Sequence, residues 1–408
     1  MAVLVGGSIG NQHIRRYARC VVLYLTTAIA VIAAIPLLLF IAIAMFSWRV
    51  PPAPPVGSRG RRVVVVIPAH NESAVIERLL QSLVGQTYDA ELLETHVIAD
   101  RCSDGTAEIA RQLATVHERA DGPGTKGAAV RWVLDRIAIA EEDLVVFLDA
   151  DNRVGPDFVA SLVDGLDSGH SVMQVYLEPE NPDVTYVALA GAISTWLSNR
   201  LINLPRGNLG VSAQIAGTGF AMAGHLVGEM KNSERELVED QVLSDDLVMS
   251  GERIVWMHRI VVFDEKPSSV PVLVRQRARW AKGEREGRAE SLRRLLSGRA
   301  PWSMSRMDRV LRRVLPSRTI SATVLWLVGV LGFVWPDILA FSLWVIPALF
   351  LVLAILILAA LVVENVGFAR IAKVPLLVVF ALIWLPERLI SRRQEGWYHT
   401  PHGESPDD

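Results

Sequence analysis

The sequence has almost no cysteine and almost no excess of either charge. Cys20 and Cys102 are its only two cysteines among 408 residues. They lie far apart without the spacing of a zinc ligand set, so neither a disulfide framework nor a zinc site is expected. Lysine and arginine number 41 against 43 aspartates and glutamates, a formal net charge of −2. A nearly neutral chain lacks the basic footprint of nucleic-acid binding, and we expect no nucleic-acid partner.

Apolar residues are in excess, and they are concentrated at the two ends of the chain. They make up 51% of the sequence, and the mean hydropathy is +0.32, which is too apolar for an ordinary soluble enzyme. Between the ends lies a stretch of normal composition that is long enough for one large domain. The composition therefore predicts a membrane-attached protein with one water-exposed domain.

The N-terminal apolar segment, Val21–Ser47, is long enough to cross a bilayer with some tilt. It follows a basic segment (1–20) and precedes a proline-rich linker (48–60). A cleaved signal peptide is the alternative, but the apolar core is too long and no small-residue cleavage site follows it. We expect a retained transmembrane anchor. Arginines flank it on both sides, so charge alone leaves its orientation open.

Strands alternate with helices in the region 61–285. Three short apolar runs are typical of buried parallel strands, and each is followed by polar residues: Val63–Ile67, Thr95–Ala99 and Leu144–Leu148. Helices are expected after these strands and before the third, over 73–84, 106–114 and 128–139. This alternation predicts an α/β domain with a doubly wound sheet.

Asp149-Ala150-Asp151 follows the third apolar run. Residues i and i+2 of an extended segment point the same way, so both carboxylates can converge at the carboxyl end of the strand. Ligands bind at that end in open α/β sheets. Two close carboxylates either share a proton or hold a hard cation such as Mg²⁺ together with substrate phosphates. Taken alone, the pair also suits an ordinary polar strand end.

Several motifs, in order, resemble those of family 2 glycosyltransferases. They are Ile67–Glu72 (IPAHNE), Ala99–Thr106 (ADRCSDGT), Lys126-Gly127, Asp149–Asp151, Glu239-Asp240 and Gln276–Trp280 (QRARW). The last two resemble the membrane-bound branch, which includes cellulose, chitin, hyaluronan and poly-N-acetylglucosamine synthases and ceramide glucosyltransferase. The resemblance implies a GT-A fold with a mixed sheet, and inverting transfer of a sugar from a nucleoside diphosphate.

The resemblance also implies a UDP-sugar donor site. Asp100 would accept the N–H of the uracil edge, and the segment after the first strand would line the nucleotide, with Pro68, Ala69, Asn71 and Glu72. We expect Asp104 to close its turn and cap the following helix, with nucleotide binding as the alternative. Lys126 would approach the diphosphate, unless it is a solvated loop lysine.

Asp149 would face the ribose or a metal, and Asp151 the metal itself, Mg²⁺ or Mn²⁺. Such an ion acts as a Lewis acid for the departing diphosphate. Asp240 is our candidate for the general base that deprotonates the acceptor hydroxyl, with Glu239 assisting. Asp245-Asp246 is a rival pair, but its spacing to Gly251 and the following strand does not match the family pattern. An acidic helix start is the alternative for the first pair.

Two further segments are expected at the acceptor and the diphosphate. Gly217-Thr218-Gly219 lacks bulk, which allows a sugar to approach closely. Gln276, Arg279 and Trp280 share one face of a helix. The indole suits stacking on a sugar ring, and the guanidinium suits a bidentate grip on phosphate. An interfacial amphipathic helix is the alternative, because many basic residues follow.

The C-terminal part is expected to lie on and in the membrane. Residues 286–318 are basic and indicate helices at the interface. Within 319–390, Thr319–Trp335 and Ile338–Val363 indicate two spans, and Val374–Leu385 a third span, a re-entrant piece or an interfacial helix. Residues 391–408 form a tail.

The spans are few for a self-contained polymer channel. The acceptor is therefore either a lipid, or a polysaccharide whose synthase needs a second copy or an accessory membrane subunit. We expect an integral protein of the plasma membrane with its catalytic domain in the cytoplasm, where nucleotide sugars are. A non-catalytic scaffold that retains the fold would lack ionisable site residues, and none is missing. A transporter would need more spans and charged residues within them.

Overall fold

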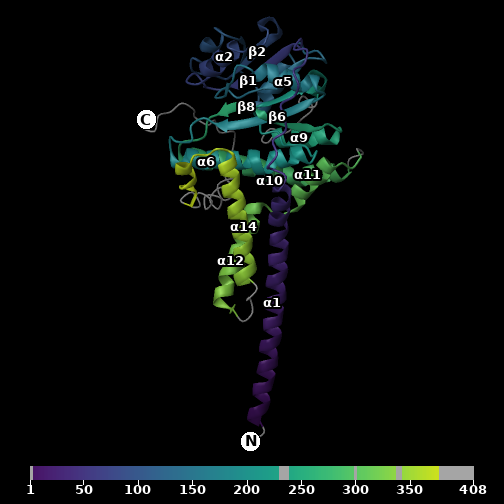
Figure 1. The fold of residues 1–408 in the computed structure, drawn as a ribbon, viewed down its shortest axis with the longest axis vertical. Helices are drawn as coiled ribbons and strands as arrows, with labels where there is room; N and C mark the ends of the chain where they lie inside the picture. The colour runs from purple at the N-terminus through teal and green to yellow at the C-terminus, as the bar shows by residue number, and fades with distance from the viewer. Residues whose placement is uncertain (1–2, 229–238, 298–300, 337–341, 376–408) are drawn as a thin grey trace.

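The structure is a computed structural model that describes residues 3–228, 239–297, 301–336 and 342–375. A head, made of one sheet and its covering helices, stands on a stalk of apolar helices (Figure 1). The sheet lies in the upper part of the head. Three helices lie between the sheet and the stalk: α6 (Tyr186–Ser198), α10 (Val270–Ser297) and α11 (Met304–Val314).

Eight strands form one mixed sheet of order β3-β2-β1-β4-β7-β6-β8-β5. Their bounds are β1 Val63–Ala69, β2 Leu93–Asp100, β3 Thr115–Arg119, β4 Leu144–Phe147, β5 Arg153–Val154, β6 Val172–Pro179, β7 Phe220–Ala223 and β8 Ile254–Asp264. Strands β3, β2, β1 and β4 run parallel to one another, and β7 runs antiparallel to both β4 and β6. The expected doubly wound mixed sheet is confirmed.

The sheet differs from expectation at β1 and β3. β1 continues through Pro68 to Ala69, and both residues still pair with β2. Beyond Val66, β1 has no strand partner on the β4 side, so the missing N–H of the proline costs no ladder bond there. β3 was not expected, because Thr115–Arg119 is short and largely polar at the edge of the sheet.

Helices cover both faces of the sheet. In the head they are α2 Ile76–Val84, α3 Thr106–Ala110, α4 Lys126–Leu134, α5 Phe158–Asp167, α6 Tyr186–Ser198, α7 Leu204–Asn208, α9 Glu239–Met249, α10 Val270–Ser297 and α11 Met304–Val314, with short turns η1 Ala90–Leu92, η2 Asn199–Asn203 and η3 Gly224–Leu226. Alternate residues of β1 enter two apolar clusters, one under α2 and α5 and one under α4, α6 and α9.

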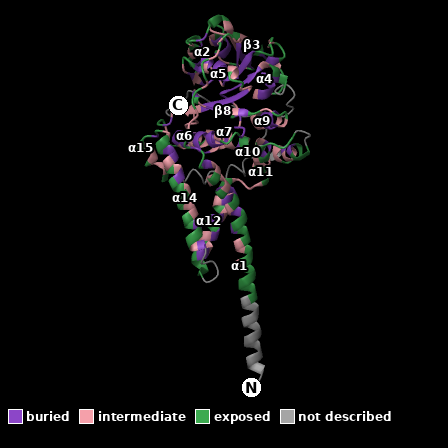
Figure 2. Cartoon of the chain, turned by 45° about the vertical axis from the view of Figure 1, so that its right-hand side comes forward, coloured by how far each residue is buried: buried purple, intermediate pink, exposed green. Residues whose placement is uncertain are grey.

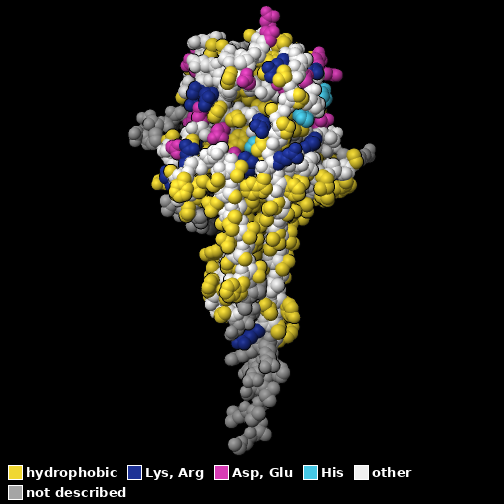
Figure 3. Space-filling model, in the orientation of Figure 1, with side chains coloured by type: hydrophobic (Ala, Val, Ile, Leu, Met, Phe, Trp, Pro, Cys, Tyr) yellow, Lys and Arg dark blue, Asp and Glu magenta, His cyan; other side chains and the backbone are white. Residues whose placement is uncertain are grey.

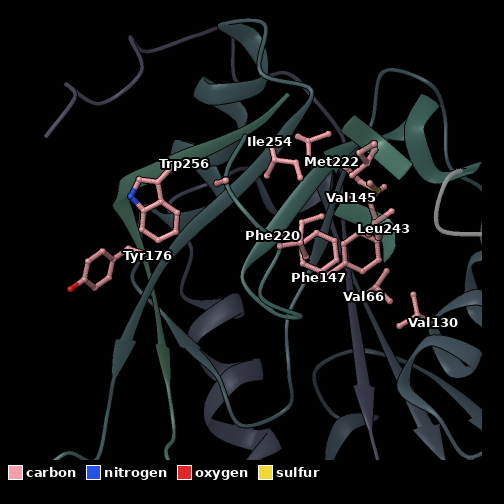
Figure 4. Close-up of a cluster of buried hydrophobic side chains, with 14 of the residues drawn as sticks. Val66, Val130, Val145, Phe147, Tyr176, Phe220, Met222, Leu243, Ile254 and Trp256 are labelled. Atoms are coloured by element: carbon pink, nitrogen blue, oxygen red, sulfur yellow. The ribbon is translucent and has the colours of Figure 1, made fainter. Parts of the chain in front are cut away.

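The second cluster joins α9 to the sheet. The rings of Phe147 and Phe220 stack with centroids 4.5 Å apart, and Leu243 of α9 belongs to the same cluster (Figure 4). Burying a side chain of this size stabilises the fold by about 1.5–3 kcal/mol. The position of α9 is therefore set partly by the sheet.

The stalk consists of α1 Val3–Ala44, α12 Arg318–Val334 and α14 Ser342–Val363, and α15 Phe368–Ile371 follows. Tyr17–Ala44 and Ser342–Val363 are each long and apolar enough to span a membrane. α12 becomes a third candidate only if it forms one bent span with α11, to which it is inclined by 48°. Most of Val374–Leu385 lies outside the described residues. The outward faces of the stalk are largely exposed and apolar (Figures 2 and 3), as expected for contact with lipid.

A buried ion pair joins the stalk to the head. Arg200 of η2 pairs with Glu364, which directly follows α14, and its Nη1 donates to the carbonyl of Ser47 at 3.1 Å. The hydroxyl of Tyr176 on β6 donates to the same carboxylate at 2.5 Å. Removing one partner of a buried pair costs about 3–5 kcal/mol. The ends of α1 and α14 are therefore fixed against the sheet.

Candidate active site

Two loops at the carboxyl ends of β1 and β2 are tied together by hydrogen bonds. Asn71 adopts a left-handed conformation (φ 57°), and its Oδ1 accepts the N–H of Ser103 at 2.8 Å. The hydroxyl of Thr106 accepts the N–H of Glu72 at 2.8 Å. The segment expected to line the nucleotide is thus held against the turn that follows Asp100.

Asp104 closes this turn. Its carboxylate accepts the N–H and hydroxyl of Thr106 and the N–H of Ser73, the two N–H bonds at 3.1 Å each. Burial alone would raise the pKa of Asp104, but these hydrogen bonds outweigh it and lower the pKa to about 2. The structure gives Asp104 the contacts of the turn-closing residue expected from the sequence.

Asp100 is oriented by an arginine from the edge strand. Nη1 of Arg119 donates to Oδ1 of Asp100 at 2.6 Å, and Arg101 donates to the other oxygen at 3.2 Å. Arg119 is only 4% exposed and lies opposite Asp100 in the β2–β3 register. Arg119 was not predicted as a site residue, because β3, the strand that carries it, was not predicted. An arginine at the end of a short strand-like run was the available signal.

Lys126 is not a solvated loop residue. It is the first residue of α4, where Thr125 caps the helix. Its Nζ contacts the carboxylate of Asp149 and donates to the carbonyl of Gly217 at 2.7 Å. Lys126 therefore brings together the aspartate that follows β4 and the glycine-rich segment.

The glycine-rich segment is held by Gln174 of β6, which is fully buried. Its side chain accepts the N–H of Ala216 at 2.8 Å and donates to the carbonyls of Thr218 and Gly219 at 3.0 and 2.9 Å. At Gly219, φ is +61°, and an added Cβ would lie 3.0 Å from side chains of β6. The hydroxyl of Thr218 accepts the N–H of Asp149 at 2.9 Å. Gln174 was missed, although it is the one amide in an apolar strand.

Several carboxylates crowd around Asp151. Burial raises the pKa of Asp151 well above its usual range, and the negative charges of Asp264 and Asp149 add to this effect. Burial and the charge of Asp149 likewise raise the pKa of Glu72 to about 9. Asp264 ends β8, and Asn152 lies between it and Asp151, donating to the two carboxylates at 3.4 and 3.3 Å. No role could be predicted for Asp264 from the sequence.

These carboxylates suit a metal ion by the type of their donor atoms. No three His, Cys, Asp or Glu side chains form a ready metal site in the part of the chain that the structure describes. However, carboxylates that lie close together and repel one another suit a hard divalent cation, which also binds oxygens of substrate phosphates. The chemistry of Asp149 and Asp151 therefore fits Mg²⁺ or Mn²⁺.

Asp240 lies in α9 among cations. Burial raises its pKa, while a backbone N–H bond and the positive charges of Lys126 and Arg279 act in the opposite direction. These two cations belong to α4 and α10, and their positive charges act on this carboxylate of α9. Glu239 is the first residue of α9, and its side chain is outside the described part.

The rival acidic pair has other partners. Asp245 pairs with Arg309 and Arg313 of α11 at 2.8 and 2.9 Å. Asp246 pairs with Arg294 of α10 at 2.7 Å. Both carboxylates are therefore held in ion pairs with neighbouring helices.

The expected helix over Gln276, Arg279 and Trp280 is present as part of α10. Gln276 and Arg279 are partly buried, and Trp280 is 51% exposed. A half-exposed indole beside a partly buried guanidinium can contact a ligand without rearrangement of the helix. The arrangement as a whole offers oriented carboxylates, two cations and a glycine-rich loop.

Comparison with known proteins agrees with this arrangement. A family model described as glycosyltransferase like family 2 matches residues 60–283, more than half of the chain. A probable glycosyltransferase of Bacillus subtilis, YdaM, is 27% identical over 239 residues, covering 54% of this chain and 55% of the relative. A beta-monoglucosyldiacylglycerol synthase of Trichormus variabilis is 24% identical over 241 residues, covering 54% and 48%. The chain thus spans about half the length of these relatives.

The fold also matches a solved structure. A mannosyltransferase of Pyrobaculum calidifontis, solved with GDP-mannose and Mn²⁺, superposes with a TM-score of 0.53 at 21% identity, covering 90% of this chain and 95% of that chain. This match shows the GT-A-like fold that the sequence motifs implied. With the family model matching more than half of its length, the chain belongs to the family 2 glycosyltransferases.

Proposed function

We propose that this glycosyltransferase moves a sugar from a UDP-sugar to a lipid at the bilayer surface, with inversion and with Asp240 as the general base. The observation that carries the proposal is the position of Lys126, whose positive charge, like that of Arg279, acts on Asp240. Lys126 also contacts Asp149 and the glycine-rich segment. One cation thus links the expected donor, metal and acceptor positions.

The donor would lie across the carboxyl ends of β1, β2 and β4. Arg119 orients the carboxylate of Asp100, which can only accept hydrogen bonds and so suits the N–H of a uracil ring. Asn71 and Glu72 would face the nucleotide from the loop after β1. The aspartates Asp149 and Asp151 would hold Mg²⁺ or Mn²⁺, which stabilises the negative charge of the leaving diphosphate.

A base for the acceptor hydroxyl must be ionised but not too weakly basic. Burial raises the pKa of Asp240 toward the working pH, and the cations Lys126 and Arg279 keep the ionised form accessible. The ion pairs of Asp245 and Asp246 with arginines support Asp240 over the rival pair. Arg279 would be close enough to steady a phosphate, and Trp280 to stack on a sugar ring.

A lipid acceptor is favoured over a polysaccharide. Two relatives are named as beta-monoglucosyldiacylglycerol synthases, and the described part of the chain offers two candidate spans, or three with the bent pair. A polymer would require a translocation path supplied by a second copy or an accessory subunit. We place the head in the cytoplasm, where nucleotide sugars occur, as part of an integral protein of the plasma membrane.

The test is a donor and acceptor screen with the full chain in lipid nanodiscs. UDP-glucose, UDP-N-acetylglucosamine, UDP-galactose, UDP-glucuronate and GDP-mannose are each supplied with Mg²⁺ or Mn²⁺, and the products are sized. The proposal predicts a lipid that carries one or a few sugars from a UDP donor, and no product with EDTA. A long polymer would overturn the acceptor, and transfer from GDP-mannose alone would overturn the nucleotide.

A further inference from the structure

The helix α11 has its charged side inside and its apolar side outside. Arg306 and Arg309 are 1% and 4% exposed, whereas Met304 and Val314 are 65% and 57% exposed. The exposed apolar residues recur at spacings of three and four, so they form one stripe along the helix. We call these residues the apolar stripe: Met304, Met307, Leu311 and Val314. The sequence predicted a basic helix at the interface but not this orientation.

The arginines of α11 bind the helix that carries the candidate base. Arg309 and Arg313 hold opposite oxygens of Asp245 in α9. Arg313 also donates to the side chain of Gln241 at 3.1 Å, and Gln241 is the neighbour of Asp240. α11 therefore fixes the position of Asp240 through two neighbours in α9, the carboxylate of Asp245 and the side-chain amide of Gln241.

The same helix holds the segment that leads to the glycine-rich loop. Arg309 donates to the carbonyl of Ala213 at 3.1 Å, and Arg312 donates to the side chain of Gln214 at 3.0 Å. The hydroxyl of Ser305 accepts the N–H of Ser212 at 2.9 Å. α11 thus contacts both the base helix and the start of the acceptor loop.

The apolar stripe lies beside the membrane-facing part of the protein. α12, whose outward face is apolar, begins at Arg318, directly after α11. Figure 3 shows hydrophobic side chains continuing from the stalk onto the underside of the head, where α11 lies. Trp302 and Leu296, 60% and 52% exposed, extend this surface. A bilayer surface is the occupant that is continuous with the spans.

We propose that α11 lies in the bilayer surface through its apolar stripe and that its arginines hold α9, and thereby Asp240, in the position needed for transfer. The inference rests on the proposed role of Asp240. Arg309 is then a positioning residue, and the activity depends on the contact between α11 and the bilayer.

The test uses the full chain in nanodiscs and a double variant, Met307→Glu with Leu311→Glu. α1 and α14 keep this variant in the membrane, while two charges lift α11 from the lipid. The matched control is Val84→Glu, because Val84 is 66% exposed on α2, away from the stalk. Hydrogen exchange of the α9 amides and transfer kinetics are measured for each. If the glutamate pair does not fold, Met307→Ser with Leu311→Ser replaces it.

We expect exchange in α9 to rise about tenfold in the double variant and to stay unchanged in Val84→Glu. The rate constant kcat should fall about 100-fold, because a displaced base is poorly aligned, while the KM for the donor is retained. Arg309→Met should reproduce this split, and Arg309→Lys, which keeps the charge beside Asp245, should restore most of the rate.

Unchanged exchange in α9 would overturn the inference, whatever the transfer rate. A change in oligomeric state with unchanged exchange would assign the stripe to a second copy and would also overturn it. If exchange in α9 rises in the double variant but no donor supports transfer by the wild type, α11 does hold α9 and the proposed function is wrong.

Discussion

Replacing Gln174 by leucine should loosen the glycine-rich loop without changing the size of the buried side chain much. Gln174 makes three hydrogen bonds, to the buried carbonyls of Thr218 and Gly219 and to the N–H of the exposed Ala216. Each hydrogen bond lost costs about 1 kcal/mol, so the total loss is about 3 kcal/mol. For a domain of this size, that corresponds to a fall in Tm of roughly 6–12 °C.

The assay is thermal unfolding of the full chain in one detergent, followed by circular dichroism, with transfer measured in parallel. Gln112→Leu is the matched control, because Gln112 is exposed after α3 and should change Tm little. Transfer should also fall in Gln174→Leu, since the loop contacts Lys126 through Gly217. If Gln174→Leu melts with the wild type and transfers sugar at the same rate, the loop is not held as described.

Three further predictions concern single residues of the site. Because the pKa of Glu72 is raised, the folded state binds more protons than the unfolded state, and wild-type stability falls as pH rises from the usual glutamate range to about 9; Glu72→Gln should reduce this fall, to which Asp151 also contributes, and parallel Tm curves against pH in EDTA would contradict it. Gly219→Ala should lower stability by about 1–2 kcal/mol in urea unfolding, because its φ is positive and β6 leaves no room; unchanged stability would refute this strain. Arg119→Met should weaken UDP binding about tenfold in calorimetry, because it leaves Asp100 unoriented; equal affinity would remove Asp100 from the nucleotide site.

The buried strands could be predicted because each is a run of consecutive apolar residues that is visible in the sequence. Val63–Ile67 and Leu144–Leu148 are apolar on both faces, and only the interior of a parallel sheet suits them. β3 could not be predicted in this way, because an edge strand buries only part of its surface and tolerates polar residues. Arg119 was lost with it.

The site residues divide in the same way. Asp149, Asp151 and Asp240 follow motifs whose spacing is visible in the sequence, so they could be proposed before the fold was known. The roles of Gln174, Asp264 and the α11 arginines depend on pairings between segments far apart in the chain. Asp245, for example, meets Arg309 across 64 positions. Such contacts arise from tertiary packing and leave no local pattern.

The most direct test of the account is single-turnover transfer by Asp240→Asn in nanodiscs, with donor binding measured on the same sample. Asp246→Asn is the control. It also removes a carboxylate from α9, but that carboxylate pairs with Arg294. We expect Asp240→Asn to lose about 100- to 10,000-fold in rate and to keep its donor affinity, while Asp246→Asn changes the rate only a few-fold. Full transfer by Asp240→Asn, or loss of transfer only in Asp246→Asn, would contradict the assignment of the base.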